Sequence, residues 1–451
     1  MSFSSQQKKH RKVMLVTLEP ISRSMAGPAI RAVEMAKQLA KEFFVTVVSP
    51  VPQAAEDELP PIEGVKIVTG ANRHVMYEEA LANDVLIIQS NVLRPFPKLS
   101  ELGKFLVVDL YDPYLFSVLV QYKHEKVAGE ASYRLMHQVL EKHMLKCDFA
   151  ICASETQRDY WLGRFCSMGR LMPALYEFDP SLRKLIDVVP FGREPSAPQR
   201  NGPGLREEFA VIGDDDLVLL WGGGIWDWFD PLTVIGAVAR ARERVPNLRL
   251  VFMGLKSPNP KVPMMKMTKD AIELSDKLGL TGASVFFKEG WIPYEKRVNY
   301  LLDADVAVSA HFDLPETRYS FRTRILDYLW CGLPVLSTGG DPLSDMIDRA
   351  GAGVALPYKD ENAWSDAIVR MAFDKAFRQG CSEQSTKLSN EFTWDRTCKA
   401  LVDYCRQPYQ LPQHVKVTMP SVIERARAVY ARGGGELVMK RSREIISDLF
   451  G

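Results

Sequence analysis

Short, unbroken runs of apolar residues recur along the chain and alternate with stretches that have helical spacing. Such runs are typical of strands that are covered on both faces, as in a parallel sheet. The pattern stops and then begins again, which predicts two sheets rather than one. The runs that predict strands are 13–18, 45–48, 85–88, 105–108 and 149–152 before the pause, and 217–221, 248–253, 284–287, 305–309, 334–337 and 353–356 after it.

The pause at residues 188–204 is rich in proline and glycine and holds few apolar residues, as expected of an interdomain linker. We therefore predict an α/β protein with two doubly wound domains, at residues 1–195 and 196–390. Residues 391–451 are predicted to be helical and to pack back on the first domain. Ligands of such folds bind outside the carboxyl ends of the strands, so the loops that follow strands are the candidate functional regions.

Composition narrows the class of protein. The 451 residues are 46% hydrophobic and 25% charged, as in soluble globular proteins, and the net charge of +1 gives no reason to expect a nucleic-acid partner. The chain has no apolar run of about 18 residues, and its first twelve residues are too polar for a signal peptide. Its 7 cysteines lack C-x-x-C spacing, which favours a reduced, cytoplasmic protein without bound metal.

The stretch ETRYSFRTRILDYLWCGLPVLSTGGDP, residues 316–342, carries charges beside an apolar helical pattern. Ser320 is predicted to cap a helix that starts near Phe321. The amino end of a helix binds anions, and Arg322 adds a donor fork that suits phosphate. Asp327 could accept hydrogen bonds from a diol. An internal Arg324–Asp327 pair on an exposed helix face explains the same residues equally well.

Two glycine loops are further candidates for contact with phosphate. Gly223 and Gly224 lie in a run of three glycines that ends a predicted strand, where a ligand can approach the backbone closely. Gly27 opens the first helix after the first predicted strand, at another anion-friendly position. A plain tight turn remains the alternative at each loop.

Polar and aromatic side chains follow two other predicted strands. Asp109 and Asp112 come after the strand at 105–108, and one of them could act as a base or orient a hydroxyl. Asp112-Pro113 could equally be a simple helix start. Trp291 follows the strand at 284–287, where it either lines a nucleobase site or only packs against a turn.

The last segment, ELVMKRSREIISDLF at residues 436–450, is amphipathic and carries cations on one face. It also carries Glu444 and Asp448, which weaken attraction to an anionic surface. We interpret it as a packing arm with one solvated face, and contact with a membrane surface or a partner stays open.

Several of these motifs, in this order, resemble glycosyltransferase family 4, whose members have the two-domain GT-B fold. The family pattern Glu-x-Phe-Gly-x-x-x-x-Glu corresponds to YSFRTRILD at 319–327. It is followed here by CGLPV at 331–335 and by two glycines at 339–340. FKEGWIP at 287–293 and FTWDRT at 392–397 also match, and the resemblance covers about residues 12–405.

The resemblance implies roles for these positions. The first Glu of the family faces the donor sugar; Tyr319 stands there, and Glu316 could replace its contact. The second Glu holds the ribose and corresponds to Asp327. The usual diphosphate-binding cations after the first strand of the second domain are missing, so Arg322 or Arg324 would replace them. The expected catalytic residues are therefore Asp112, Glu316 and Tyr319, and the expected nucleotide-binding residues are Gly27, Gly223, Gly224, Trp291, Arg322, Arg324, Asp327 and Gly340.

The resemblance further implies a cytoplasmic, retaining glycosyltransferase of polysaccharide biosynthesis. Such an enzyme would transfer a sugar from a nucleotide-diphospho-sugar to a glycan or lipid-linked glycan without a metal or other cofactor. Peripheral contact with the inner membrane surface stays open. Alternatives of the same fold are a nucleotide-sugar epimerase, a phosphorylase, and a non-catalytic assembly subunit.

Overall fold

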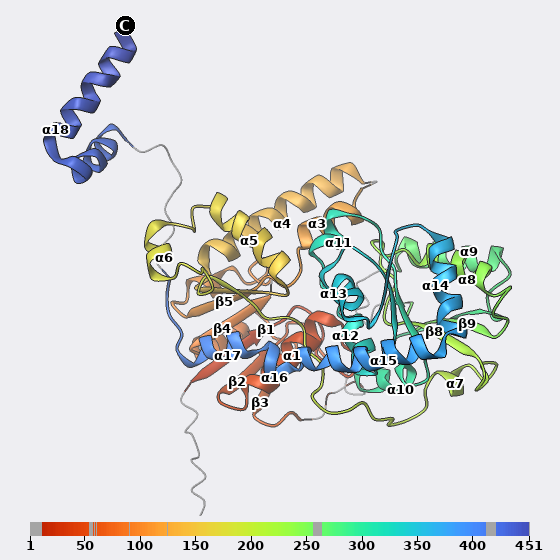
Figure 1. Ribbon diagram of the computed structural model, residues 1–451. Coiled ribbons are helices and arrows are strands. Elements are labelled where there is room, and N and C mark those ends of the chain that lie inside the picture. Colours follow the sequence, from red (N-terminus) through yellow and green to blue (C-terminus); the bar gives the residue numbers. More distant parts are fainter. Residues whose placement is uncertain are drawn as a thin grey trace, which may run out of the picture.

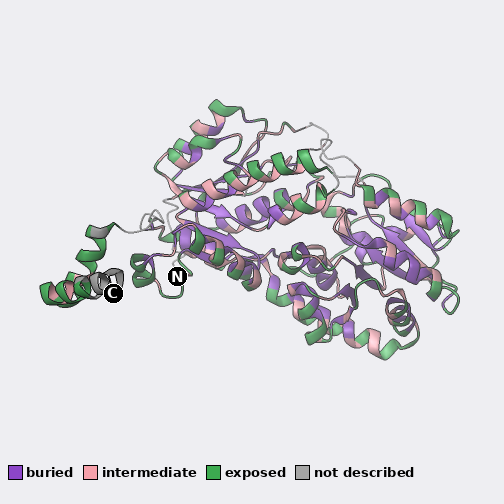
Figure 2. Cartoon of the chain, turned by 90° about the horizontal axis from the view of Figure 1, so that it is seen from above, coloured by how far each residue is buried: buried purple, intermediate pink, exposed green. Residues whose placement is uncertain are grey.

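Two parallel sheets stand side by side and form the centres of the two halves of the molecule (Figure 1). This computed structural model describes residues 11–450, except for 54–56, 58, 60, 90, 124, 256–263 and 412–420. The side chains at 422, 442 and 444–450 also lie outside the described part. The strands are buried and the outward helix faces are exposed (Figure 2), which confirms the predicted α/β fold with two doubly wound sheets.

The first sheet has seven strands in the order β3-β2-β1-β4-β5-β6-β7, and all of their pairings are parallel. The chain reverses its direction of winding between β1 and β4, where Val16 pairs with Ile88. The strands are β1 (Lys12–Val16), β2 (Phe44–Val48), β3 (Val65–Val68), β4 (Val85–Gln89), β5 (Phe105–Asp109), β6 (Phe149–Cys152) and β7 (Ile186–Val188).

The helices of the first domain connect these strands and cover the sheet. Local signals set several of their starts: Ser154 Oγ accepts a hydrogen bond from Gln157 N at 3.1 Å, and Pro28 occupies the first turn of α1. The helices are α1 (Gly27–Leu39), α2 (Arg73–Leu81), the short η2 (Pro97–Glu101), α3 (Tyr114–Gln121), α4 (Lys126–Lys146), α5 (Glu155–Ser167) and α6 (Pro173–Phe178).

The second sheet has six parallel strands in the order β10-β9-β8-β11-β12-β13. This order is that of a Rossmann fold, and winding reverses between β8 and β11. The strands are β8 (Leu217–Trp221), β9 (Leu248–Phe252), β10 (Val285–Phe287), β11 (Val306–Ser309), β12 (Val335–Thr338) and β13 (Gly353–Leu356).

The helices of the second domain include two short ones, α11 and α12, that carry most of the candidate residues. The full set is α7 (Leu205–Glu208), α8 (Pro231–Ala241), α9 (Lys266–Lys277), η3 (Tyr294–Lys296), α10 (Arg297–Leu301), α11 (Pro315–Tyr319), α12 (Arg324–Trp330), α13 (Pro342–Ala350), α14 (Glu361–Phe373) and α15 (Lys375–Ser389).

The segment after α15 returns to the first domain. It forms η4 (Asn390–Phe392), α16 (Trp394–Thr397) and α17 (Lys399–Arg406). The ring of Trp394 lies 4.8 Å from that of Phe191, and Tyr404 stacks on Phe149 at 4.7 Å. These contacts place the segment on the first sheet.

The last helix, α18 (Val422–Phe450), stands away from both sheets (Figure 1). Its backbone departs from helical geometry at Gly433 and Gly434, and most of its described side chains are exposed. Within the described residues, no helix combines the length and the apolar character needed to cross a membrane.

Direct contacts join the two domains. Tyr319 of α11 stacks on Phe116 of α3, with ring centroids 5.6 Å apart and an interplanar angle of 13°. Elsewhere, Tyr294 N donates to Arg23 O at 3.0 Å, and Arg23 pairs with Glu295 at 2.9 Å. The two halves are therefore tied by contacts from several elements rather than by the linker alone.

Candidate active site

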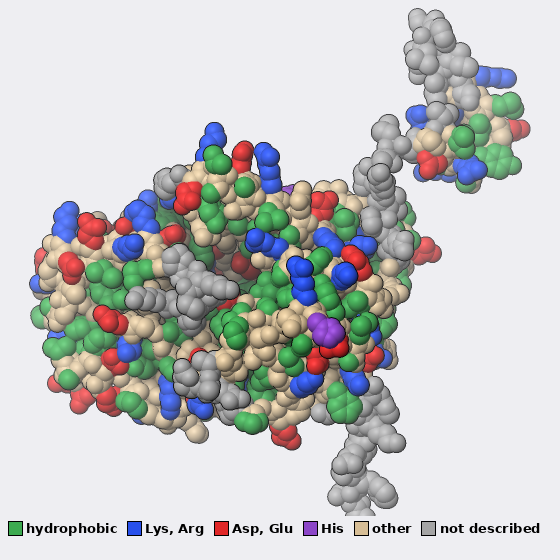
Figure 3. Space-filling view, turned by 180° about the vertical axis from the view of Figure 1, so that it is seen from behind, with side chains coloured by type: hydrophobic (Ala, Val, Ile, Leu, Met, Phe, Trp, Pro, Cys, Tyr) green, Lys and Arg blue, Asp and Glu red, His purple; other side chains and the backbone are tan. Residues whose placement is uncertain are grey.

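A cavity of about 450 Å³ lies between the two domains, at the carboxyl ends of the strands. The first domain contributes the loop after β1, the start of α1 and the loop after β5. The second domain contributes the loop after β8 and the segment that leads from α11 into α12. Figure 3 shows the hollow between the two halves from outside. This position is where doubly wound domains hold their ligands.

The loop after β8 approaches α12 so closely that glycine is required. Gly222 N donates to the Tyr328 hydroxyl at 2.7 Å, and a Cβ at Gly222 would lie 2.9 Å from the Tyr328 ring. Gly223 has a φ of +75°, a region that other residues rarely adopt. Close packing against Tyr328 and the positive φ of Gly223 thus explain the three-glycine run. The run also exposes backbone to the cavity.

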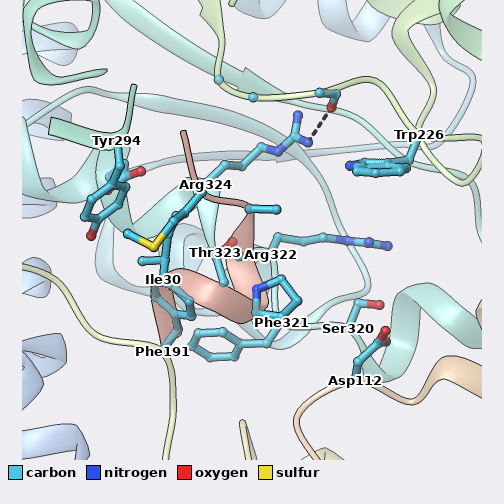
Figure 4. Close-up of a pocket in the computed structure, with 18 of the residues that line it drawn as sticks. Ile30, Asp112, Phe191, Trp226, Tyr294, Ser320, Phe321, Arg322, Thr323 and Arg324 are labelled. Carbon is cyan, nitrogen blue, oxygen red and sulfur yellow. Dashed lines mark hydrogen bonds between the residues drawn. The ribbon is translucent and has the colours of Figure 1, made fainter. Parts of the chain in front are cut away.

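Arg324 is a cation without a carboxylate partner in the described part of the chain. Its Nη2 donates to Gly224 O at 2.8 Å, and its Nη1 is buried without a hydrogen-bond partner (Figure 4). The guanidinium lies over the Phe229 ring, with Cζ 4.1 Å from the centroid. Burial lowers the pKa of Arg324 to about 10. The site therefore holds positive charge in a place that disfavours it, next to the glycine loop.

Arg322 leaves the same segment in a different direction and is neutralised within the protein. Its Nη1 and Nη2 donate to Glu316 Oε1 and Oε2, at 3.1 and 2.7 Å. Both side chains are buried, and Ser320 Oγ also donates to Glu316 Oε1. Glu316 and Arg322 both line the cavity, but each already satisfies the other.

The predicted start of the helix is wrong. Ser320 does not cap it, because its hydroxyl is bonded to Glu316, and α12 begins at Arg324 with Thr323 at the N-cap. Thr323 makes no side-chain cap hydrogen bond. The short, irregular start of α12 directs Arg322 and Arg324 to different parts of the cavity, as Figure 4 shows.

Asp327 lines the cavity and pairs with Arg297 of α10, at 3.0 Å between Oδ1 and Nη2. The alternative of an Arg324–Asp327 pair is therefore not what the structure shows. Burial raises the pKa of Asp327, and the charge of Arg297 opposes that rise. The Arg297 guanidinium also lies 3.6 Å from the centroid of Tyr294.

Asp112 belongs to the first domain and lies near the charges of Glu316 and Arg322. Its carboxylate is open to the cavity, and it makes no hydrogen bond to the described residues. Asp112 is exposed to the cleft, where the surrounding protein and the charge of Glu316 raise the pKa of Asp112 to about 7 and the charge of Arg322 opposes that rise. A carboxylate with such a pKa is suited to proton transfer near neutral pH. Asp109, by contrast, is held by Arg31 at 2.7 Å in the core.

Aromatic side chains cover the second-domain side of the cavity. Trp226 and Trp228 stack with centroids 5.4 Å apart and an angle of 2°, and Trp291 lies against Gly224 and Gly254. All three line the cavity. They supply flat apolar faces of the kind that bind a base or a sugar ring.

Most of the site residues expected from the sequence meet at this cavity, and two do not. Tyr319 packs between the domains, where it stacks on Phe116, and is not among the lining residues. Gly340 lies on an exposed loop after β12, with its N–H directed to Asp345 at 3.4 Å. The residues that do line the cavity are Gly27, Asp112, Gly223, Gly224, Trp291, Glu316, Arg322, Arg324 and Asp327.

Sequence reasoning missed Arg297, which pairs with Asp327 from another element. Nothing in its spacing marks it, because Arg297 lies 30 residues before its partner. The buried His311–Asp341 pair, at 2.9 Å, was also missed, although Asp341-Pro342 is a recognisable helix start. His311 and Asp341 do not line the cavity and serve the packing around α13.

Solved structures with the same architecture define the class of fold. Sucrose-phosphate synthase from Thermosynechococcus elongatus aligns over 88% of this chain and 99% of its own, with a TM-score of 0.62 and 15% identity. HepE from Anabaena, in complex with UDP-glucose, aligns over 89% of this chain and 100% of its own, with a TM-score of 0.60 and 14% identity. The chain has the GT-B fold.

Sequence comparison identifies the second domain further. The family model described as Glycosyl transferases group 1 matches residues 217–374, which lie within the second domain, and this match supports the resemblance seen in the sequence. The D-inositol 3-phosphate glycosyltransferase of Saccharomonospora viridis is 28% identical over 236 residues, 50% of this chain and 52% of that protein. That of Corynebacterium urealyticum is 26% identical over 185 residues, 41% of each. The chain spans about half the length of these curated relatives.

Proposed function

We propose that the protein is a retaining glycosyltransferase that uses a nucleotide-diphospho-sugar as donor. The observation that carries this proposal is the half-buried Arg324, whose Nη1 is buried without a hydrogen bond, which has no carboxylate partner in the described chain and which lies against the glycine loop. A buried charge without a partner is costly, so its retention points to a charged ligand. The group 1 match and the nucleotide-bound structures of the same fold support a nucleotide sugar as that ligand.

In this proposal the donor diphosphate binds beside Arg324 and the backbone of Gly223 and Gly224. Negative charge develops on the leaving diphosphate as its bond to the sugar breaks. Arg324 then stabilises the transition state more than the ground state, since it donates to oxygens whose charge is rising. The proposal assigns this neutralisation to Arg324 and to backbone N–H groups, and to no metal or other cofactor.

The remaining cavity residues have distinct roles in the proposal. Asp327 accepts a hydrogen bond from the ribose, and Trp291 packs against the base. Glu316 acts through Arg322, which it holds in place at the sugar end of the cavity. Asp112 accepts a hydrogen bond from the acceptor hydroxyl and orients it toward the anomeric carbon. Contacts across the domain interface, such as Tyr319 on Phe116, keep water out of the closed site.

A thermal-shift experiment tests the donor site, because a ligand that binds only the native state raises its melting temperature. The wild-type chain is screened with UDP, GDP, ADP and UDP-glucose, and the best ligand is then tested on variants. We expect Arg324→Gln to lose the shift and Arg318→Gln to keep it. Arg318 is a matched control because it is exposed, lies in the adjacent helix α11 and does not line the cavity.

Turnover is measured separately, as release of nucleoside diphosphate from the same donor in the presence of candidate acceptors. Release that requires an acceptor supports a transferase. A nucleotide-dependent shift without release, even with a broad acceptor panel, favours an assembly subunit that binds the nucleotide sugar. The Glu316–Arg322 pair favours this second function, because each of the two side chains is already satisfied by the other. No shift with any nucleotide would refute the proposal.

Three further assignments belong to the same proposal. The acceptor is a glycan or a lipid-linked glycan, and the product enters polysaccharide biosynthesis. The reaction takes place in the cytoplasm, as the seven unpaired cysteines suggest. Peripheral membrane contact would involve α18, whose side chains at 444–450 lie outside the described part.

A further inference from the structure

The two walls of the cavity differ in charge. All three arginines that line it, Arg297, Arg322 and Arg324, belong to the second domain. On the first-domain wall, the described lining residues include no lysine, arginine or histidine. That wall instead combines apolar side chains such as Met25 and Phe191 with the carboxylates of Glu19 and Asp112.

Arg31, a buried cation of the first domain behind this wall, is fully occupied. Its Nε and Nη2 donate to the two oxygens of Asp109 at 2.7 and 3.0 Å, and the guanidinium also donates to the carbonyls of Val189 and Pro190. The exposed fraction of the Arg31 side chain is 1%. Releasing it toward a ligand would leave Asp109 charged and unpaired in the core.

The amino end of α1 is the other positive feature near this wall, since it carries the positive end of the helix dipole. Pro28 in its first turn has no N–H, which removes one of the donors. Its N-cap residue Ala26 has no side chain that could add a donor. This end therefore offers partial backbone charge but no full cation.

Asp112 shows that the wall already resists negative charge. Its exposed carboxylate has no hydrogen-bond partner among the described residues, and the surrounding protein and Glu316 raise the pKa of Asp112 to about 7 even though the charge of Arg322 lowers it. A phosphate placed beside it would bring a further negative charge into the same enclosure. Like charges in such places repel strongly because the protein screens them less than water does.

We propose that the acceptor subsite takes an uncharged, hydroxyl-bearing sugar or polyol and discriminates against phosphorylated acceptors. This inference rests on the proposed transferase function and names its acceptor class. It sets the chain apart from the relatives named as D-inositol 3-phosphate glycosyltransferases, whose name specifies a phosphorylated acceptor. Asp112 receives the hydrogen bond of the neutral acceptor, and Met25 and Phe191 pack against its carbon face.

Matched pairs of small acceptors test the inference. The full-length protein, saturated with the nucleoside diphosphate that gives the largest thermal shift, is examined by saturation-transfer NMR at pH 8, where Asp112 is ionised. The pairs are myo-inositol with inositol 3-phosphate, and methyl glucoside with glucose 6-phosphate. We expect the neutral member of each pair to bind at least about tenfold more tightly, from the repulsion between charges a few ångströms apart.

Two variants separate charge from shape. Asp112→Asn should narrow the difference within each pair, and Asp112→Lys should reverse it in favour of the phosphorylated member. Tighter binding of a phosphorylated acceptor to the wild type, including binding at the amino end of α1, would overturn the inference. So would a neutral panel that gives no signal at 50 mM. Either result with an intact nucleotide shift leaves the donor proposal standing, whereas loss of the nucleotide shift itself refutes that proposal.

Discussion

Replacement of Arg324 by glutamine should leave the stability of the ligand-free protein nearly unchanged while it weakens ligand binding strongly. Burial lowers the pKa of Arg324 to about 10 from the ordinary 12.5, so its charged form is disfavoured by about 3 kcal/mol. Glutamine removes this cost but also loses the hydrogen bond to Gly224 and the contact with Phe229, which together contribute about 2–3 kcal/mol. Glutamine should thus leave the ligand-free free energy of unfolding within about 1 kcal/mol of wild type, a melting shift of about 3 °C at most.

The same substitution should sharply weaken nucleotide binding. A hydrogen bond to a charged group contributes about 1.5–3 kcal/mol, so its loss raises the dissociation constant by about 10- to 150-fold. At a ligand concentration about 100 times the wild-type dissociation constant, ligand stabilises the wild type by about 2.7 kcal/mol. With a 50-fold weaker site this falls to about 0.6 kcal/mol. Calorimetric titration measures the affinity, and urea unfolding measures the ligand-free stability.

Arg322→Gln provides the contrast. It leaves the Glu316 carboxylate, whose side chain is 3% exposed, without its ion-pair partner, which should cost about 3–5 kcal/mol of stability. If Arg324→Gln instead destabilises the ligand-free protein by several kcal/mol, its cationic side chain is structural. If it binds nucleotide as tightly as wild type does, Arg324 does not hold the diphosphate. Either outcome would refute the reasoning.

Three further changes have defined outcomes. The pKa of Asp112 in the folded state lies above its value in the unfolded chain, so ionisation of Asp112 destabilises the folded state as pH rises from about 4 to 7. Asp112→Asn should therefore be more stable than wild type at pH 8 but not at pH 4. Urea unfolding at the two pH values measures the difference. Asp327→Leu leaves Arg297 unpaired and should lower the unfolding free energy by about 3 kcal/mol, whereas the double variant Asp327→Leu/Arg297→Leu should recover most of it; Arg297→Leu completes the double-mutant cycle. Tyr319→Ala removes the stack on Phe116 and should increase the radius of gyration of the ligand-free protein in small-angle X-ray scattering; an unchanged radius would show that other contacts hold the domains together.

Most strands could be predicted because they lie inside sheets covered on both faces, where most side chains are apolar. Eleven of the thirteen strands follow from unbroken apolar runs. The two that the pattern missed are β3 and β7, at the two edges of the first sheet. β3 is half-exposed and interrupted by Lys66, and β7 is only three residues long and contains Asp187. An edge strand has fewer neighbours and so needs fewer apolar residues.

The site could be predicted as a region but not as a set of partners. The sequence brought Arg322, Arg324 and Asp327 together because they are neighbours at the start of one helix. It could not show that Glu316 takes Arg322 and that Arg297 takes Asp327, since these pairings depend on how α10, α11 and α12 pack. These pairings decide which charged side chains stay free to contact a ligand. Only the fold determines the pairings.

The positions of the unpaired charges in the cavity also fix the orientation of a donor under the proposed function. Two of the three arginines in the cavity are neutralised by carboxylates, which leaves Arg324 on the second-domain wall and Asp112 on the first. A diphosphate brings at least two negative charges, so it is attracted toward Arg324 and repelled from Asp112. The sugar attached to it must then extend toward Asp112, between Arg322 and the first domain. The reacting carbon would face the wall where an uncharged acceptor has its hydrogen-bond acceptor, which is the arrangement that transfer requires.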